Sequence, residues 1–231
     1  MMTAREAAGA AAESDRSRFL DVYANVEAYY SARVARYGAT PRGVDWSCQA
    51  TQDLRFVQLL KVCDFSAPFS LNDIGCGYGA LCAFLARRHP QAAIDYLGTD
   101  LSLAMIRRAR RRFSAPGRRF KVGKGGPRIA TYSVASGVMN VNVGCSRQSW
   151  EAFVAQMLAE MRRTSLRGFA VNFVTDQAEC TAGATAGQVQ LYCTSPEPWI
   201  HYCERELGCA VETIDGYGMN EVTLLVRCNG S

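Results

Sequence analysis

The stretch Phe69-Ser-Leu-Asn-Asp-Ile-Gly-Cys-Gly-Tyr-Gly79 decides the fold of this chain. Its apolar first half predicts a buried strand, and its alternating glycines predict a tight turn in which the backbone can approach a ligand closely. Residues 80–88 have a helical pattern, and a second apolar run, residues 94–99, ends at Asp100. A carboxylate there can accept hydrogen bonds from both ribose hydroxyls, so the order strand, glycine turn, helix, strand, acid predicts a pocket for a nucleoside cofactor.

The glycine spacing separates two classes of cofactor. Gly75, Gly77 and Gly79 form Gly-x-Gly-x-Gly, whereas turns that bind nicotinamide dinucleotides have Gly-x-Gly-x-x-Gly. Asp73, just before the turn, would repel a pyrophosphate but attract the cationic amino acid and sulfonium groups of S-adenosylmethionine. The alternatives are a plain tight turn for the glycines and, for Asp100, an acid that only stabilises a helix N-terminus.

Helices and strands alternate along the chain. The sequence predicts helices over residues 16–37, 51–62, 79–88, 102–113, 149–163 and 196–207, and strands over residues 70–74, 94–99, 120–122, 133–136, 168–174, 209–214 and 221–228. In the second helix, Leu54, Val57 and Leu60 are expected to face inward. The alternation predicts an α/β fold with a doubly wound, mostly parallel seven-stranded sheet and an antiparallel C-terminal hairpin.

The predicted elements divide the chain into three parts. We expect a disordered tail over residues 1–15, an N-terminal helical lid over 16–66 and a Rossmann-like domain over 67–231. No apolar stretch is long enough to span a bilayer, and the N-terminal residues lack the apolar core of a signal peptide. The sequence therefore favours a cytoplasmic protein with no membrane partner.

The cysteines and the basic residues each allow two interpretations. Because no export signal is visible, the ten cysteines are expected to be reduced and to pack as small apolar residues. None forms a Cys-x-x-Cys pair, so no metal site is expected; a scattered thiolate site for a soft metal or arsenic is the alternative. The net charge is +5, and residues 107–128 contain ten Lys or Arg and no acid. Arg107, Arg108, Arg111 and Arg112 point outward on the predicted helix, which favours a solvated surface over a docking surface for RNA.

At these motifs the chain resembles the class I, Rossmann-like, S-adenosylmethionine-dependent methyltransferases. Residues 73–79, Asp-Ile-Gly-Cys-Gly-Tyr-Gly, are similar to their first motif, and residues 98–102, Gly-Thr-Asp-Leu-Ser, to their second. The resemblance covers residues 45–228. Four further segments resemble a bacterial group of small methyltransferases: Pro-Arg-Gly-Val-Asp-Trp at 41–46, Gln-x-x-Arg-Phe at 52–56, Ala-Ser-Gly-Val-Met-Asn at 135–140 and Gly-Phe-Ala-Val-Asn at 168–172.

The resemblance implies S-adenosylmethionine as cofactor and S-adenosylhomocysteine as product. It implies that the methionine moiety is held by Asp73 and by the backbone of Gly75, Cys76, Gly77 and Gly79. It implies that Asp100 binds the ribose and that Leu101 and Met105 flank the adenine. Ser136 and Gly137 would line the pocket. Two positions depart from the family. Gly123-Lys124 replaces an acid that often contacts adenine, and the fourth strand ends in Ala-Ser-Gly, which argues against methylation of nucleic-acid base amines.

Catalytic and acceptor residues are less explicit in the sequence. Methyl transfer displaces a neutral leaving group, so alignment and desolvation can supply most of the acceleration without a dedicated base. The catalytic candidates are His201, whose alternative is a partly exposed helix histidine, and Tyr30. The candidate acceptor contacts are Tyr29, Tyr30, Trp46, Asn140 and Tyr192. Tyr192 follows the Gly/Ala/Thr-rich segment 176–190, which is expected to form a long loop. Tyr23, Val26 and Tyr30 share a helical face, for which core packing is the alternative.

The short chain, without an appended recognition domain, favours a methyltransferase for a small-molecule acceptor, acting as a monomer or homodimer. One alternative is an RNA or protein methyltransferase that docks through residues 107–128, and salt-dependent RNA binding would support it. The other is a sensor that binds S-adenosylmethionine and transfers no methyl group.

Overall fold

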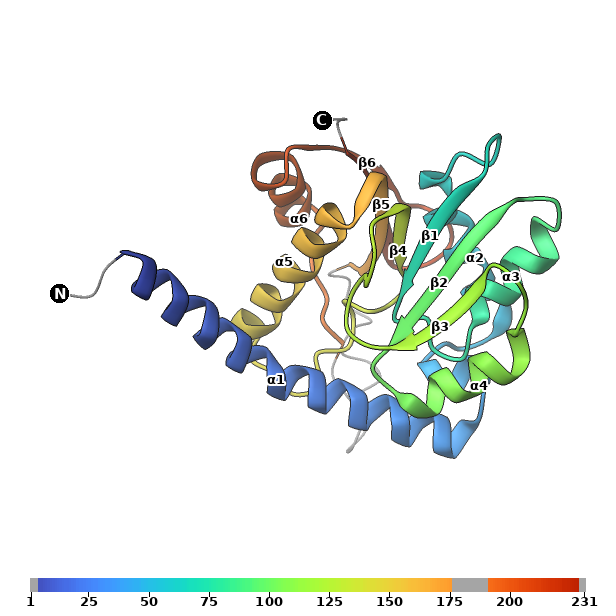
Figure 1. Ribbon diagram of the computed structural model, residues 1–231, viewed down its shortest axis with the longest axis horizontal. Coiled ribbons are helices and arrows are strands. Elements are labelled where there is room, and N and C mark those ends of the chain that lie inside the picture. The colour runs from blue at the N-terminus through green and yellow to red at the C-terminus, as the bar shows by residue number, and fades with distance from the viewer. Residues whose placement is uncertain (1–3, 176–190, 229–231) are drawn as a thin grey trace.

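Seven strands form a single sheet in the order β3-β2-β1-β4-β5-β7-β6 (Figure 1). The computed structural model describes residues 4–175 and 191–228. The strands are β1 Phe69–Ile74, β2 Ile94–Asp100, β3 Arg118–Val122, β4 Ala130–Ala135, β5 Ser165–Val174, β6 Cys209–Ile214 and β7 Glu221–Cys228. β1 to β5 pair in parallel, and β7 is antiparallel to both β5 and β6, so the predicted sheet and its terminal hairpin are confirmed.

The strand order fixes where a ligand can bind. The chain goes from β1 outward to β2 and β3, then crosses back to β4 on the other side of β1. At such a switch point the loops after neighbouring strands leave in opposite directions and open a crevice at the carboxyl ends of the strands. The glycine turn follows β1, and Asp100 ends β2. Both therefore lie at this crevice.

Helices cover both faces of the sheet (Figure 1). They are α1 Ala4–Tyr37, α2 Gln49–Leu59, α3 Ala80–Arg88, α4 Leu103–Phe113, α5 Arg147–Arg163 and α6 Glu197–His201, with a π-helical turn over Tyr202–Glu206 and 3₁₀ turns over Pro41–Val44 and Leu60–Val62. The apolar sides of α2, α3 and α4 form one core cluster with β1 and β2. Those of α5 and α6 form a second cluster with β5 and β7.

α1 crosses the carboxyl-end edge of the sheet as one long helix (Figure 1). The helix that we expect from residue 16 begins at Ala4, so residues 4–15, expected as a tail, continue it; this segment is rich in alanine, the strongest helix former. The rings of Phe19 and Tyr23 lie 6.0 and 5.3 Å from that of Phe153 on α5. Val34 joins the cluster of α2, α3 and α4. α1 therefore bridges both cores above the crevice.

The buried face of α2 differs from the prediction. Val57, expected inside, is 41% exposed, whereas the polar Gln52 and Arg55 are buried beside Phe56. The prediction counted only apolar residues. Gln52 instead accepts a hydrogen bond of 3.0 Å from the buried Tyr78 hydroxyl, and Arg55 has a buried acidic partner. Satisfied polar groups can occupy an inward face at little free-energy cost.

The cysteines differ from the prediction at one described position. Cys193 is disulfide-bonded, whereas eight other cysteines of the described chain are free. The expectation of reduced thiols was based on the absence of an export signal. That signal does not show which cysteines lie close enough in the fold to form a disulfide bond. Within residues 4–175 and 191–228, no helix is both long enough and apolar enough to cross a bilayer.

Candidate functional site

The turn after β1 requires glycine at three positions. Gly75, Gly77 and Gly79 all have positive φ, at 72°, 54° and 87°, a region that disfavours side chains. A Cβ on Gly79 would lie 2.8 Å from the ring of Phe113. The amides of Gly75 and Cys76 both donate to the carbonyl of the β2 residue before Asp100, at 2.8 and 2.9 Å, which ties the turn to the end of β2.

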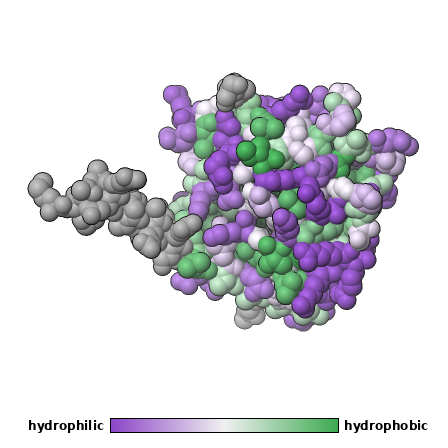
Figure 2. All heavy atoms as spheres, viewed as in Figure 1, coloured by the Kyte–Doolittle hydropathy of each residue, from purple (hydrophilic) through white to green (hydrophobic). Residues whose placement is uncertain are grey.

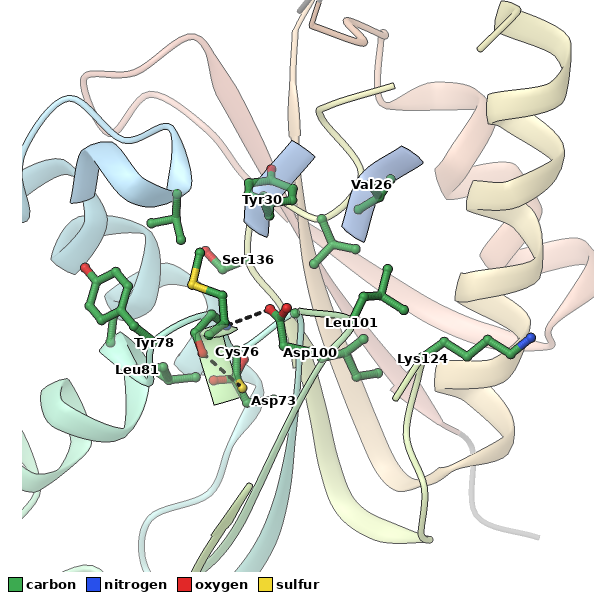
Figure 3. Close-up of a pocket in the computed structure, with 18 of the residues that line it drawn as sticks. Val26, Tyr30, Asp73, Cys76, Tyr78, Leu81, Asp100, Leu101, Lys124 and Ser136 are labelled. Carbon is green, nitrogen blue, oxygen red and sulfur yellow. Dashed lines mark hydrogen bonds between the residues drawn. The ribbon is translucent and has the colours of Figure 1, made fainter. Parts of the chain in front are cut away.

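Asp100 orders the turn from the end of β2 (Figure 3). One carboxylate oxygen accepts the Gly77 amide at 2.9 Å, and the other accepts the Ser102 amide at 2.8 Å. Burial raises the pKa of Asp100 to about 6, and the two amide hydrogen bonds oppose that shift. Ser102 also caps α4 by accepting the Met105 amide.

A second carboxyl group is buried beneath the turn. Asp73, in β1, is 3% exposed and accepts a hydrogen bond from the Tyr96 hydroxyl of β2. Burial raises the pKa of Asp73 to about 7, the Tyr96 hydrogen bond opposes that shift, and the nearby Asp100 charge adds to it. Two carboxyl groups with raised pKa values therefore face one pocket, an arrangement that disfavours an anionic ligand and favours a cationic one.

The first cavity lies between this turn and α1. Nine of the ten predicted cofactor contacts line it: Asp73, Gly75, Cys76, Gly77, Asp100, Leu101, Met105, Ser136 and Gly137. Gly79, the tenth, lies just beyond, as the N-cap of α3. Val26 and Tyr30 of α1 face Asp100 across the cavity (Figure 3), and Tyr23 lines it as well. This helical face therefore lines the cavity and also packs against the two core clusters, so the core-packing alternative holds as well.

Two of the charged lining residues were not predicted as site residues. Glu27 lines the cavity from α1 and accepts a hydrogen bond of 2.6 Å from Ser31, whose hydroxyl lies 2.7 Å from that of Ser102. Lys124 lines it from the loop after β3, with its Nζ 4.6 Å from the ring centroid of Tyr23. Glu27 could have been found by extending the Tyr23 face by one turn.

A second cavity, of about 330 Å³, adjoins the first. The two cavities adjoin at four boundary residues that line both of them: Tyr30, Val44, Trp46 and Gly137. Asn140 lines only the second cavity. Three of the five predicted acceptor contacts, Tyr30, Trp46 and Asn140, are thus brought together at one place.

The other candidates lie elsewhere. Tyr29 lines neither cavity; its ring lies 5.1 Å from that of Tyr30, and burial and Asp45 raise its pKa. Tyr192 is buried against α5, where its hydroxyl donates to Glu151 at 3.2 Å. His201 is exposed at the end of α6 and lines neither cavity.

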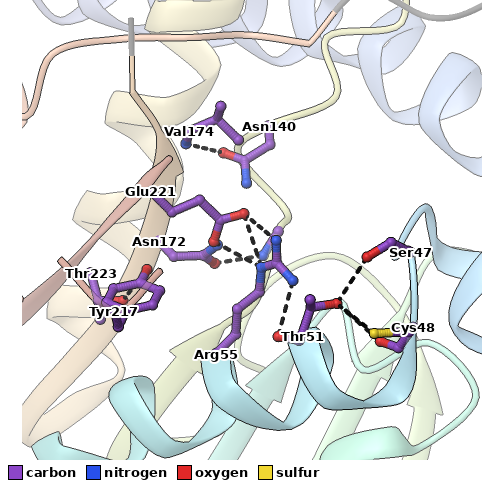
Figure 4. Close-up of polar contacts among 11 residues, drawn as sticks. Ser47, Cys48, Thr51, Arg55, Asn140, Asn172, Val174, Tyr217, Glu221 and Thr223 are labelled. Carbon is purple, nitrogen blue, oxygen red and sulfur yellow. Dashed lines mark hydrogen bonds and ion pairs between the residues drawn. The ribbon is translucent and has the colours of Figure 1, made fainter. Parts of the chain in front are cut away.

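The floor of the second cavity is a buried ion pair that the sequence did not predict (Figure 4). Arg55 of α2 donates from Nε and Nη2 to the carboxylate of Glu221, the first residue of β7. Asn172 of β5 donates to the same carboxylate at 2.9 Å and accepts the Gly137 amide at 2.8 Å. The guanidinium carbon of Arg55 lies 3.7 Å from the ring centroid of Trp46. The ion pair therefore supports two of the boundary residues, Trp46 and Gly137.

Comparisons with known proteins agree with this geometry. A family model described as "Methyltransferase domain" matches residues 72–168. The candidate methyltransferase Rv1506c of Mycobacterium tuberculosis is 34% identical over 169 residues, which are 73% of this chain and 98% of that protein. This chain belongs to the methyltransferase family.

Solved methyltransferases share the fold at low sequence identity. The magnesium protoporphyrin IX methyltransferase of Synechocystis, solved with S-adenosylhomocysteine, superposes with a TM-score of 0.58 at 15% identity and covers 78% of this chain and 83% of its own. A TehB-like S-adenosylmethionine-dependent methyltransferase of Corynebacterium glutamicum has a TM-score of 0.54 at 16% identity. The match covers 87% of this chain and 99% of that protein's chain. This methyltransferase therefore has the class I fold.

The basic segment of this methyltransferase lies on α4 and β3. Figure 2 shows hydrophilic side chains gathered at the lower right, where Figure 1 places α4. Several of the cations contact the fold itself. Arg110 donates to the Phe120 carbonyl at 2.7 Å, Arg112 donates to the Ala39 carbonyl at 3.2 Å, and Arg119 pairs with Asp95 at 2.7 Å.

Proposed function

We propose that this methyltransferase binds S-adenosylmethionine in the first cavity and transfers its methyl group to a small-molecule acceptor. The observation that carries the proposal is the pairing of the glycine turn with Asp100, which presents a carboxylate and a close-approach backbone to one cavity. Ser136 adds a buried hydroxyl oxygen that has no hydrogen-bond partner among the described residues and lines the same cavity. A polar ligand group would satisfy it.

The residues present suit this cofactor. Asp73 and the turn would hold its amino acid portion, because a cationic ammonium favours the ionised form of a buried carboxyl group. Asp100 would accept hydrogen bonds from the ribose, and Leu101 and Met105 supply apolar surface for the adenine. When bound, S-adenosylmethionine supplies a methyl group on a sulfonium whose departure leaves a neutral thioether.

The protein's contribution is alignment and exclusion of water rather than a strong base. α1 covers the first cavity, and the boundary residues Tyr30 and Trp46 lie where it adjoins the second. Burial raises the pKa of Tyr30 well above its usual value, so its hydroxyl stays protonated at neutral pH. Tyr30 would therefore donate a hydrogen bond and orient a ligand, which suits catalysis by positioning.

The second cavity has the size of a pocket for a small acceptor. Its volume of about 330 Å³ lies at the small end of the usual range for ligand pockets, about 300–1,000 Å³. The RNA alternative is based on the basic segment, residues 107–128. Three of its side chains, Arg110, Arg112 and Arg119, instead form hydrogen bonds or an ion pair with other parts of the fold.

Calorimetry with S-adenosylhomocysteine tests cofactor binding. We expect the wild-type protein to bind and Asp100→Ala to bind at least tenfold more weakly, because the variant loses the ribose contact and the Gly77 anchor. Asp95→Ala is the control, since it removes a carboxylate from the opposite end of the same strand. The proposal fails if the wild-type protein does not bind, or if Asp100→Ala binds equally well.

Mass spectrometry of methylated products then separates the acceptor classes. Wild-type protein supplied with S-adenosylmethionine and either a small-metabolite extract or total RNA should methylate only the first. Methylation of RNA would instead support docking through the basic segment. Cofactor binding without product from either pool would identify a sensor.

A further inference from the structure

The second cavity contains a donor that the protein leaves unused. Asn140 is 2% exposed, and its side-chain nitrogen, Nδ2, is buried with no hydrogen-bond partner among the described residues. A buried amide group without a partner costs about 1–3 kcal/mol, so such a group is uncommon unless something else satisfies it.

The orientation of Asn140 is fixed by its other contacts. Its side-chain oxygen accepts the Val174 amide of β5 at 3.3 Å. Its backbone carbonyl accepts the Tyr192 amide at 2.8 Å, and its own amide donates to the Gly137 carbonyl at 3.3 Å. Figure 4 shows the side-chain nitrogen turned away from Val174, toward the side of the cavity where Arg55 and Glu221 lie. Rotation of the amide would place two N–H groups against the Val174 amide, so Nδ2 is held toward the cavity.

The floor of the second cavity, toward which Asn140 Nδ2 is turned, carries no uncompensated charge among the described residues. Arg55 and Glu221 neutralise each other. Asn172 donates a further hydrogen bond to Glu221, and the Thr51 carbonyl accepts one from Arg55. On the side nearer α1, the Asp45 carboxylate pairs with Arg33. An anionic ligand would have to leave water without gaining a free counter-ion, which is unfavourable.

Trp46 gives the cavity a rigid aromatic wall. The Arg55 guanidinium lies over its ring, and a Cβ on Gly137 would come within 2.4 Å of its edge, so the indole is held against both. A flat ring system can pack on such a wall with little loss of conformational entropy.

We propose that the second cavity binds the methyl acceptor, and that Asn140 Nδ2 donates a hydrogen bond to an oxygen of an uncharged, ring-containing molecule. The proposal rests on the proposed function, because this cavity adjoins the cofactor cavity at the boundary residues Tyr30, Trp46 and Gly137. It adds the chemical class of the acceptor and a specificity residue. The carboxylate analogue of the same molecule is excluded, since its charge would have no partner.

Ligand-observed NMR with S-adenosylhomocysteine-loaded protein tests the proposal. The probes are para-hydroxyacetophenone, which is uncharged, and para-hydroxybenzoate, its carboxylate analogue. We expect the wild-type protein to bind the ketone at least tenfold more tightly than the carboxylate. Asn140→Asp keeps an oxygen for the Val174 amide but lacks the donor, and should weaken ketone binding by about tenfold. Asn140→Leu should do the same.

The affinity for S-adenosylhomocysteine is the readout that keeps the two proposals apart. It should change less than twofold in both Asn140 variants, which also shows that they are folded. Asn142→Leu, two residues along the same loop, is the matched control and should leave both affinities unchanged. Equal ketone affinity in the wild-type protein and Asn140→Asp would overturn the proposal, as would carboxylate binding as tight as ketone binding or no ketone binding at millimolar concentration. Failure of the wild-type protein to bind S-adenosylhomocysteine would instead overturn the proposed function.

Discussion

Replacing Glu221 by glutamine should destabilise this methyltransferase far more than removing an exposed ion pair. The side chains of Arg55 and Glu221 are only 9% and 5% exposed. Removing one partner of a buried pair leaves the other charge uncompensated and typically costs about 3–5 kcal/mol. Glutamine retains one carbonyl oxygen for Arg55 or Asn172, so we expect about 3 kcal/mol.

Thermal and urea denaturation measure this cost. For a chain of this size, about 3 kcal/mol corresponds to a fall in melting temperature of roughly 6–12 °C. Arg87→Met is the control, because Arg87 and Asp53 are 56% and 28% exposed and their pair should contribute at most about 1 kcal/mol.

A double variant, Arg55→Met with Glu221→Met, separates unpaired charge from lost packing. It removes both charges, so it should be more stable than Glu221→Gln alone. The reasoning is refuted if Glu221→Gln loses less than about 1 kcal/mol, or if the double variant is the less stable of the two.

Three further outcomes follow from the site. Burial raises the pKa values of Asp73 and Asp100 to about 7 and about 6, so calorimetric affinity for S-adenosylhomocysteine should rise from pH 5 to 8 as these groups ionise. The free protein should lose stability over the same range, because its folded state binds more protons than its unfolded state. Asp73→Asn should flatten both pH profiles. Gly79→Ala should cost about 1–3 kcal/mol more in urea denaturation than Gly144→Ala, because both have positive φ but only the first meets a neighbouring ring; equal costs would contradict this. RNA retention on filters at low salt should be equally weak for the wild-type protein and Arg111→Gln, and methyl transfer to a small acceptor should differ less than twofold; RNA retention that Arg111→Gln weakens would instead support the RNA alternative.

Local patterns predicted the cofactor side of the site well. Asp73, the glycines and Asp100 lie within 28 residues of sequence, and each has a chemical reason to stand where it does. The sheet followed from the alternation of elements. The helical face of Tyr23 and Tyr30 was visible in the sequence, but periodicity alone could not distinguish a core contact from a cavity wall.

The acceptor side depends on contacts that no local pattern records. Arg55 and Glu221 are separated by 166 residues, and their pairing requires β7 to be placed beside β5. The available signal was the polar Asn172 within the apolar strand β5. Tyr192 was proposed as an acceptor contact from its place beside a long loop, but the structure places it in the core against α5. Segment 176–190, which was expected to form that loop, lies outside the described residues.

The reversed direction of β7 has a practical consequence for engineering. Because this strand runs against β5, its first residue, Glu221, pairs with Val174 at the cavity edge, and Arg227 pairs with Gly168 near the opposite edge. A fusion partner or surface tether attached after β7 would therefore emerge on the side of the sheet remote from both cavities. One attached before α1 would extend the helix that covers them. Affinity tags for binding measurements belong after β7.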